Sequence, residues 1–266
     1  MVRETVARYR IDAQLDYEFA EPADVLLAME VIDGGDQLLV EDLLTVDGSG
    51  PLTPVPGEES LGRRTWLQAS GSFRAHYHAV VDVTRVPPDL DALGITPHSQ
   101  LPALVVSYLF PSRYCESDRF EQFVAREFGD VQGGAKARAM ADWIYDHVDY
   151  VSGSSDGTTT AGDSFIKRQG VCRDFAHMLI AFARAAGIPA RMVSAYAWRL
   201  DPPDFHAVVE LWLEGAWHLV DPSRLAPVDG LVRIAVGRDA TDISFMTIFG
   251  AAEMIAQSVT IEQVDA

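Results

Sequence analysis

Cysteine is scarce in this chain, and the motifs that cysteines usually form are absent from it. Only Cys115 and Cys172 occur among 266 residues, so the sequence offers neither a disulfide framework nor the CxxC pairs of a zinc site. No apolar run is long enough to cross a bilayer. The opening residues MVRETVARYR carry charge where a secretion signal has its apolar stretch. We therefore expect a soluble cytoplasmic protein with free thiols.

Positive charge is scarce as well. The chain has 21 Lys and Arg residues against 39 Asp and Glu residues, a formal net charge of −18. A surface of this sign repels phosphate backbones and anionic lipids. We therefore expect neither a nucleic-acid partner nor a membrane partner, and we interpret the excess acid as an ordinary solvated surface. Nothing in the composition indicates an oligomeric state.

The first part of the chain has the pattern of β-strands. Apolar and polar residues alternate over Val6–Leu15 and again over Ser72–Arg85, with glycine, proline and aspartate turns between the strand candidates. This spacing predicts an N-terminal β-sandwich domain over residues 1–100. Pro87-Pro88 marks a shift in composition, and helical patterns take over in residues 101–266. We expect the chemistry in this second domain.

Two histidines, His76 and His78, lie on one face of the last strand candidate in the first domain. Histidines two residues apart in a strand are able to share a metal ion, but no third ligand accompanies them. We therefore expect structural roles for both, and no metal site.

A predicted helix after Gln169 carries one of the two cysteines. Phe175, Leu179 and Phe182 recur at helical spacing, and Gly187 signals the end of the helix. Cys172 falls in the first turn, where the helix dipole and the free N–H groups favour a thiolate and are able to hold an oxyanion. The alternative is a small buried thiol that packs like alanine.

The segment Val151–Ser164 precedes this helix and is rich in Gly, Ser, Thr and Asp. Such a composition predicts an exposed loop. Because the loop leads into the cysteine region, it either borders an active site or serves as a disordered connector.

A predicted hairpin supplies a histidine and a carboxylate. Strands over Phe205–Leu213 and Ala216–Asp221 flank a two-residue turn. In that register Asp221 is the diagonal neighbour of His206, roughly 7–8 Å away between Cα atoms, and His218 falls on the opposite face. An imidazole held by a carboxylate is able to accept a thiol proton and return it to a leaving group. Alternatively, the histidine binds backbone and the aspartate forms a turn.

Four separated motifs share one family likeness. GVCRDFA, GIPAR, FHAVVE and WHLVDPS resemble the transglutaminase-like superfamily in order, spacing and residue type, over about residues 101–266. The strand-rich first part is similar to a domain that often precedes this core in bacteria. The resemblance implies a bacterial cysteine protease type with a papain-like α+β core, in which the nucleophile's helix packs on an antiparallel sheet.

The resemblance also implies roles for individual residues. Cys172 would be the nucleophile, His206 the general base and acid, and Asp221 the residue that orients the histidine. The oxyanion hole would use the Cys172 N–H and a second donor, for which Gln169 and Tyr150 are the candidates. No metal and no organic cofactor is implied.

Three positions near these motifs qualify the resemblance. Many members of the family have tryptophan where this chain has Val208, and Pro-Thr where it has Pro222-Ser223. Both changes leave the three reactive groups in place but alter the expected substrate channel. Asp174 is interpreted as a charge at the helix start, not as a catalytic carboxylate.

The chemistry implied is attack of a thiolate on an amide carbonyl, which gives a thioester acyl-enzyme. Water resolves the thioester in a peptidase or amidase, and an amine resolves it in a transglutaminase. We favour hydrolysis of a protein or peptide substrate. One alternative is a catalytically silent fold that binds proteins. Another is acyl transfer from coenzyme A, as in arylamine acetyltransferases, but the sequence has no basic or glycine-rich phosphate cradle.

Overall fold

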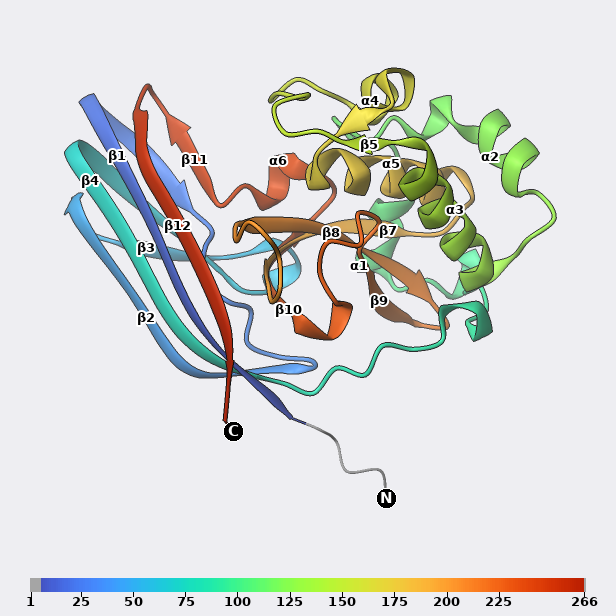
Figure 1. Ribbon diagram of the computed structural model, residues 1–266, viewed down its shortest axis with the longest axis horizontal. Coiled ribbons are helices and arrows are strands. Elements are labelled where there is room, and N and C mark those ends of the chain that lie inside the picture. The colour runs from blue at the N-terminus through green and yellow to red at the C-terminus, as the bar shows by residue number, and fades with distance from the viewer. Residues whose placement is uncertain (1–5, 266) are drawn as a thin grey trace.

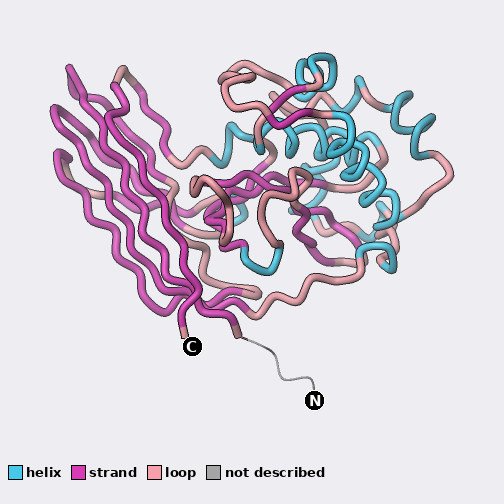
Figure 2. The backbone as a smooth tube through the Cα atoms, viewed as in Figure 1, coloured by secondary structure: helices cyan, strands magenta, loops and turns pink. Residues whose placement is uncertain are grey.

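The computed structural model describes residues 6–265 and contains two main antiparallel sheets and a group of helices. In Figure 1 the larger sheet occupies one side of the molecule, the helices occupy the other, and the smaller sheet lies between them. Colouring by secondary structure shows that the long strands and the helices are segregated in the same way (Figure 2). The α+β class expected from the sequence is confirmed. No helix in the described part of the chain is long and apolar enough to span a bilayer.

The larger sheet has six strands in the order β11-β1-β4-β2, with β12 also paired to β1 and β3 to β4. Their bounds are β1 Ala7–Leu27, β2 Gln37–Ser49, β3 Thr53–Pro56, β4 Arg63–Val83, β11 Met246–Phe249 and β12 Glu253–Val264. The strand-rich first part is thus confirmed, but the strands form one sheet instead of the two stacked sheets of a sandwich. The inner face is covered by the rest of the chain, and the outer face carries polar pairs such as Arg74 with Asp16.

The last strands of the chain belong to the first sheet, which the predicted boundary near residue 100 did not anticipate. β12 runs antiparallel to β1, from Arg8 opposite Val264 to Glu18 opposite Glu253. Figure 1 shows this C-terminal strand lying beside the N-terminal one. A pairing between the two ends of the chain leaves no local signal in the sequence, because each strand only shows its own alternation.

The smaller sheet has the order β10-β7-β8-β9. Its strands are β7 Ala190–Ala197, β8 Phe205–Leu213, β9 Ala216–Val220 and β10 Leu231–Gly237, and a short parallel pair is formed by β5 Asp149–Tyr150 and β6 Gln169–Gly170. In the hairpin, Leu213 lies opposite Ala216 and Val209 opposite Val220, which confirms the predicted register.

The helices are α1 Ala103–Val106, α2 Glu121–Phe128, α3 Gly133–His147, α4 Ala161–Lys167, α5 Cys172–Ala185 and α6 Ala240–Ile243. The predicted helix that begins at Cys172 is α5. It ends just before Gly187, whose φ of +74° is a conformation that glycine adopts without strain. α5 is packed against β7 and β8, so the first turn of the helix lies next to the smaller sheet.

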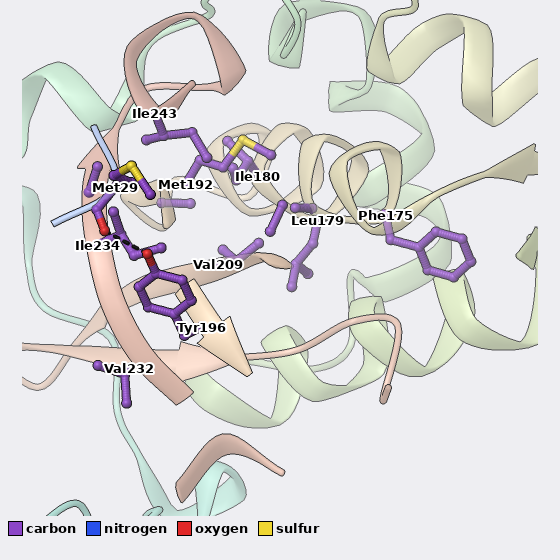
Figure 3. Packing of buried hydrophobic residues seen from close by; sticks show 14 of the residues in the cluster. Met29, Phe175, Leu179, Ile180, Met192, Tyr196, Val209, Val232, Ile234 and Ile243 are labelled. Carbon is purple, nitrogen blue, oxygen red and sulfur yellow. Dashed lines mark hydrogen bonds between the residues drawn. The ribbon is translucent and has the colours of Figure 1, made fainter. Parts of the chain in front are cut away.

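One hydrophobic core spans both predicted domains. Figure 3 shows buried side chains of α5, β7, β8 and β10 gathered with Met29, which follows the first strand. The Tyr196 hydroxyl donates to the Met29 carbonyl at 2.7 Å, so the smaller sheet is also hydrogen-bonded to this segment. The two parts of the chain therefore share one buried core and are not packed as independent domains.

Charged side chains form a second link between the sheets. Glu210 of β8 is fully buried and accepts from Arg191 at 2.7 Å and from Arg233 at 2.8 Å. Arg191 continues to Glu59 at 2.6 Å, and Arg233 continues to Asp36. A buried carboxylate is tolerated here because two guanidinium groups compensate its charge.

We predict that Glu210→Ala lowers the free energy of unfolding by about 3 kcal/mol, because it removes the fully buried carboxylate and leaves the two guanidinium groups only their more exposed partners, Glu59 and Asp36. Urea unfolding followed by circular dichroism measures this change. The control is Asp16→Ala, which breaks the solvent-exposed pair with Arg74 and should change little. Equal effects of the two substitutions would contradict a structural role for the buried network.

Candidate active site

The start of α5 is fixed by a buried carboxylate. The fully buried Asp174 accepts the Val171 N–H at 2.8 Å and a hydrogen bond from the Ser155 hydroxyl. Gly170 makes this approach possible, because a Cβ at that position would come within 2.7 Å of the Asp174 Cβ. Asp174 thus has the helix-start role expected of it. Its bond to Val171 sets where the first turn begins, and Cys172 is the first residue of that turn.

His206 and Asp221 meet at the edge of the smaller sheet. His206 Nε2 lies 2.9 Å from Asp221 Oδ2, and both side chains are buried. Asp221 Oδ1 accepts the Ser223 N–H at 2.9 Å and the Ser223 hydroxyl at 2.6 Å, while Oδ2 also accepts the Ala226 N–H at 3.1 Å. These hydrogen bonds fix the orientation of the Asp221 carboxylate.

The environment keeps Asp221 ionised and His206 protonated. Burial opposes both charges, but hydrogen bonds from His206, Ser223 and Ala226 outweigh it and lower the pKa of Asp221. For His206, burial lowers the pKa, but the hydrogen bond to Asp221 and the nearby Cys172 overcome this and raise the pKa to about 10. The arrangement therefore favours an imidazolium beside the thiol.

The thiol of Cys172 and the imidazole of His206 line one cavity. Nε2 is taken by Asp221, and the buried Nδ1 has no partner of ordinary hydrogen-bond geometry among residues 6–265. The Cys172 thiol is near enough to the ring to raise its pKa, and Cys172 and His206 line the same cavity. The structure thus brings together the three residues that the sequence singled out.

The other histidine of the hairpin points elsewhere. His218 Nε2 lies 3.1 Å from the Leu213 carbonyl oxygen, within the turn region. The choice of His206 over His218, made from the register alone, agrees with this geometry.

The two oxyanion candidates are placed differently. Burial raises the pKa of Tyr150 to about 12, with a further contribution from the neighbouring Cys172. Tyr150 thus lies near Cys172. Both Tyr150 and Gln169, on β6, are exposed, and neither is among the residues that line the cavity. An oxyanion role for either residue stays a prediction.

A cavity of about 460 Å³ opens beside the thiol and the imidazole. Its walls come from β7, β8, the start of α5, the loop before α4, and two further segments, Arg113-Tyr114 and 240–247. No local pattern in the sequence places Arg113-Tyr114 or 240–247 next to Cys172, so their position at the site depends on tertiary packing.

The loop that precedes α4 borders the site. Arg173 donates to the Ser155 hydroxyl at 3.1 Å and to the Asp156 carbonyl at 2.7 Å, and the Tyr114 hydroxyl donates to the Gly157 carbonyl at 2.6 Å. Gly157 also lines the cavity. Of the two interpretations of this loop, the structure favours a wall of the site over a disordered connector.

The paired histidines of the first part lie on the outer face of the large sheet. His76 Nε2 is 2.8 Å from Asp12 Oδ2, and His78 Nε2 is 3.6 Å from Glu41 Oε2. Within residues 6–265, no cluster of three or more Cys, His, Asp or Glu side chains is arranged to hold a metal ion.

The chain is similar to known proteins over this region and beyond it. Residues 122–222 match the model of the transglutaminase-like superfamily. A crystal structure from Cytophaga hutchinsonii, described as a "Putative Cysteine Protease", is 35% identical, with a TM-score of 0.93 over 98% of this chain and 92% of that one. An uncharacterized Mycobacterium tuberculosis protein is 24% identical over 277 residues, which cover 89% of this chain and 85% of that protein. An uncharacterized Mycobacterium leprae protein is 29% identical over 114 residues, covering 40% of this chain and 41% of that protein, less than half its length.

We predict that iodoacetamide modifies Cys172 at least about tenfold faster than Cys115 in the native protein. Burial raises the pKa of Cys115 to about 12 and shields its thiol, whereas Cys172 is partly exposed beside a protonated imidazole. Peptide mass mapping of a timed reaction distinguishes the two sites. Equal rates in folded protein would argue against an activated thiol.

We also predict a pH-dependent contribution of His206 to stability. Its folded pKa of about 10 lies above the ordinary 6.5, so its contribution is complete below pH 6.5 and is lost as the pH rises toward 10. The difference in melting temperature between the native chain and His206→Gln should therefore narrow from pH 6 to pH 10. The same difference for His218→Gln should stay flat. A gap that widens with pH would show that the histidine is neutral in the folded state.

Proposed function

This chain belongs to the transglutaminase-like superfamily, and on that premise we propose that it is a cysteine hydrolase that cleaves amide bonds in a peptide or protein through a thioester acyl-enzyme. One observation carries the proposal: a buried imidazole has one nitrogen bonded to Asp221 and the other without a hydrogen-bond partner within residues 6–265, and it lines the same cavity as Cys172. A scaffold that only binds has no need to hold thiol, imidazole and carboxylate in this order.

In the proposed reaction Cys172 acts as the thiolate and His206 as the imidazolium. The sulfur attacks the amide carbonyl carbon, the C–N bond breaks, and Nδ1 gives its proton to the departing amine. The neutral imidazole then takes a proton from water, whose oxygen attacks the thioester. The C–S bond then breaks, the acid leaves, and the Cys172 thiolate is restored beside the His206 imidazolium that carries the proton taken from water. Asp221 holds the ring in the one orientation that serves both steps.

The oxyanion formed in each step needs donors close to the sulfur. The N–H of Cys172 lies at the start of α5, where backbone N–H groups have no hydrogen-bond partner within the helix. We propose the Tyr150 hydroxyl as the second donor, because it is adjacent to Cys172. Gln169, which is exposed like Tyr150, stays the alternative donor.

Two features stay predictions from the sequence. One is the acceptor: an amine in place of water would make the same acyl-enzyme a transglutaminase. The other is the cytoplasmic location. The proposed steps use only the chain's own thiol, imidazole and carboxylate.

We predict that Cys172→Ala abolishes hydrolysis of a fluorogenic peptide-amide library, with a loss on the order of 10³-fold or more, because no acyl-enzyme forms. Asp221→Asn should lower kcat by about 10²- to 10⁴-fold while the thioester still forms slowly. Intact mass spectrometry after a rapid acid quench detects the acyl adduct.

The matched control is His218→Gln, the histidine of the same hairpin that faces away, which should keep native activity. Activity that persists in Cys172→Ala would move the chemistry elsewhere. A chain that forms no adduct with any library member would support the binding-module alternative.

A further inference from the structure

The cavity beside Cys172 has two unlike ends. Its inner end is formed by Met192, Ala207 and Ile243, which are buried and apolar. Its outer end is formed by residues that reach solvent, among them Arg113 and Arg173. A ligand that fills the cavity therefore contacts apolar side chains at the inner end and cationic groups at the mouth.

The charge at the mouth is opposite to that of the chain. Acidic residues outnumber basic ones by 39 to 21, yet the cavity is lined by no Asp or Glu anywhere in the described range 6–265. Arg173 is engaged by the loop carbonyl of Asp156 and lies 3.6 Å from Asp174. Arg113 makes no ion pair in that range and rests against the Tyr114 ring, 4.9 Å from its centre. Its guanidinium is available to a ligand.

A buried hydroxyl lies among the residues that line the cavity. Ser194 lies on β7 and lines the cavity, and its Oγ is buried without a hydrogen-bond partner within residues 6–265. An unpaired buried hydroxyl is unfavourable until a polar atom reaches it. This second observation indicates that the cavity is complete only when occupied.

Resting on the proposed function, we propose that this cavity holds the acyl part of the substrate, with an apolar side chain next to the cleaved amide and a carboxylate farther out that pairs with Arg113. The acyl group stays attached to the Cys172 sulfur through both half-reactions, so a cavity that opens at that sulfur serves it best. About 460 Å³ accommodates one large apolar side chain together with the adjoining backbone. The substrate class is a short peptide with one acidic group before an apolar residue.

The test uses three chloromethyl ketones that alkylate a thiol with loss of chloride, so that it does not depend on turnover. They are succinyl-phenylalanyl, succinamoyl-phenylalanyl and succinyl-asparaginyl chloromethyl ketone. The first two differ in charge but hardly in shape. We expect the succinyl-phenylalanyl probe to label Cys172 about fivefold faster than its neutral twin and about tenfold faster than the asparagine probe.

The variant Arg113→Gln should bring the charged and neutral probes to equal rates. Arg126→Gln, which removes an exposed guanidinium on α2 away from the cavity, should leave their ratio at the native value. Aminomethylcoumarin amides of the same three acyl groups report turnover in parallel. The preference for the charged over the neutral acyl group, and for phenylalanine over asparagine, should both appear in the kcat/KM values of these amides.

The outcomes separate this inference from the proposed function. Labelling with both preferences but no turnover upholds the cavity assignment and overturns the hydrolase. Turnover or labelling without the preferences overturns the cavity assignment and leaves the hydrolase standing. A charge preference that survives Arg113→Gln, or a chain that no probe labels at Cys172, also overturns the assignment.

Discussion

The buried hydrogen bond between His206 and Asp221 determines what the neighbouring thiol is able to do. A histidine this deep in the protein would ordinarily lose its proton, since burial disfavours charge. Asp221 reverses that preference, and it does so because Ser223 and Ala226 keep its own carboxylate ionised and fixed. The other ring nitrogen has no hydrogen-bond partner within residues 6–265, and the ring lines the same cavity as Cys172, the first residue of α5. Without the carboxylate, Cys172 would be a half-exposed thiol with no proton acceptor.

The rest of the fold holds these groups in register. His206 and Asp221 lie on adjacent strands, and Cys172 lies on a helix, so their meeting requires that α5 and the smaller sheet keep one relative position. The core around Phe182 and the β7 side chains supplies that constraint from within. The buried charges around Glu210, and the return of β12 to the first sheet, anchor the smaller sheet from the other side.

How much of the fold and of the site the sequence predicts depends on how far apart in the chain the interacting residues are. The helix start at Cys172 and the hairpin that pairs His206 with Asp221 follow from local periodicity and turn length, and the structure agrees with both. The pairing of β12 with β1 joins residues some 250 positions apart, so neither strand's pattern specifies its partner. The same limit applies to Arg113 and residues 240–247, whose place at the cavity depends on packing between distant segments.

The contrast between the acidic chain and the cationic mouth of the cavity has a consequence for selectivity. Charges separated by more than about 8 Å are largely screened at physiological ionic strength, so the net charge of −18 acts mainly near the surface. A peptide with many acidic residues meets repulsion wherever it touches the surface outside the cavity. A peptide with a single carboxylate at the right distance from its apolar residue meets Arg113 and little else. Such a surface distinguishes peptides by the position of one negative charge. Repulsion from the acidic surface excludes peptides that the contact with Arg113 alone would accept.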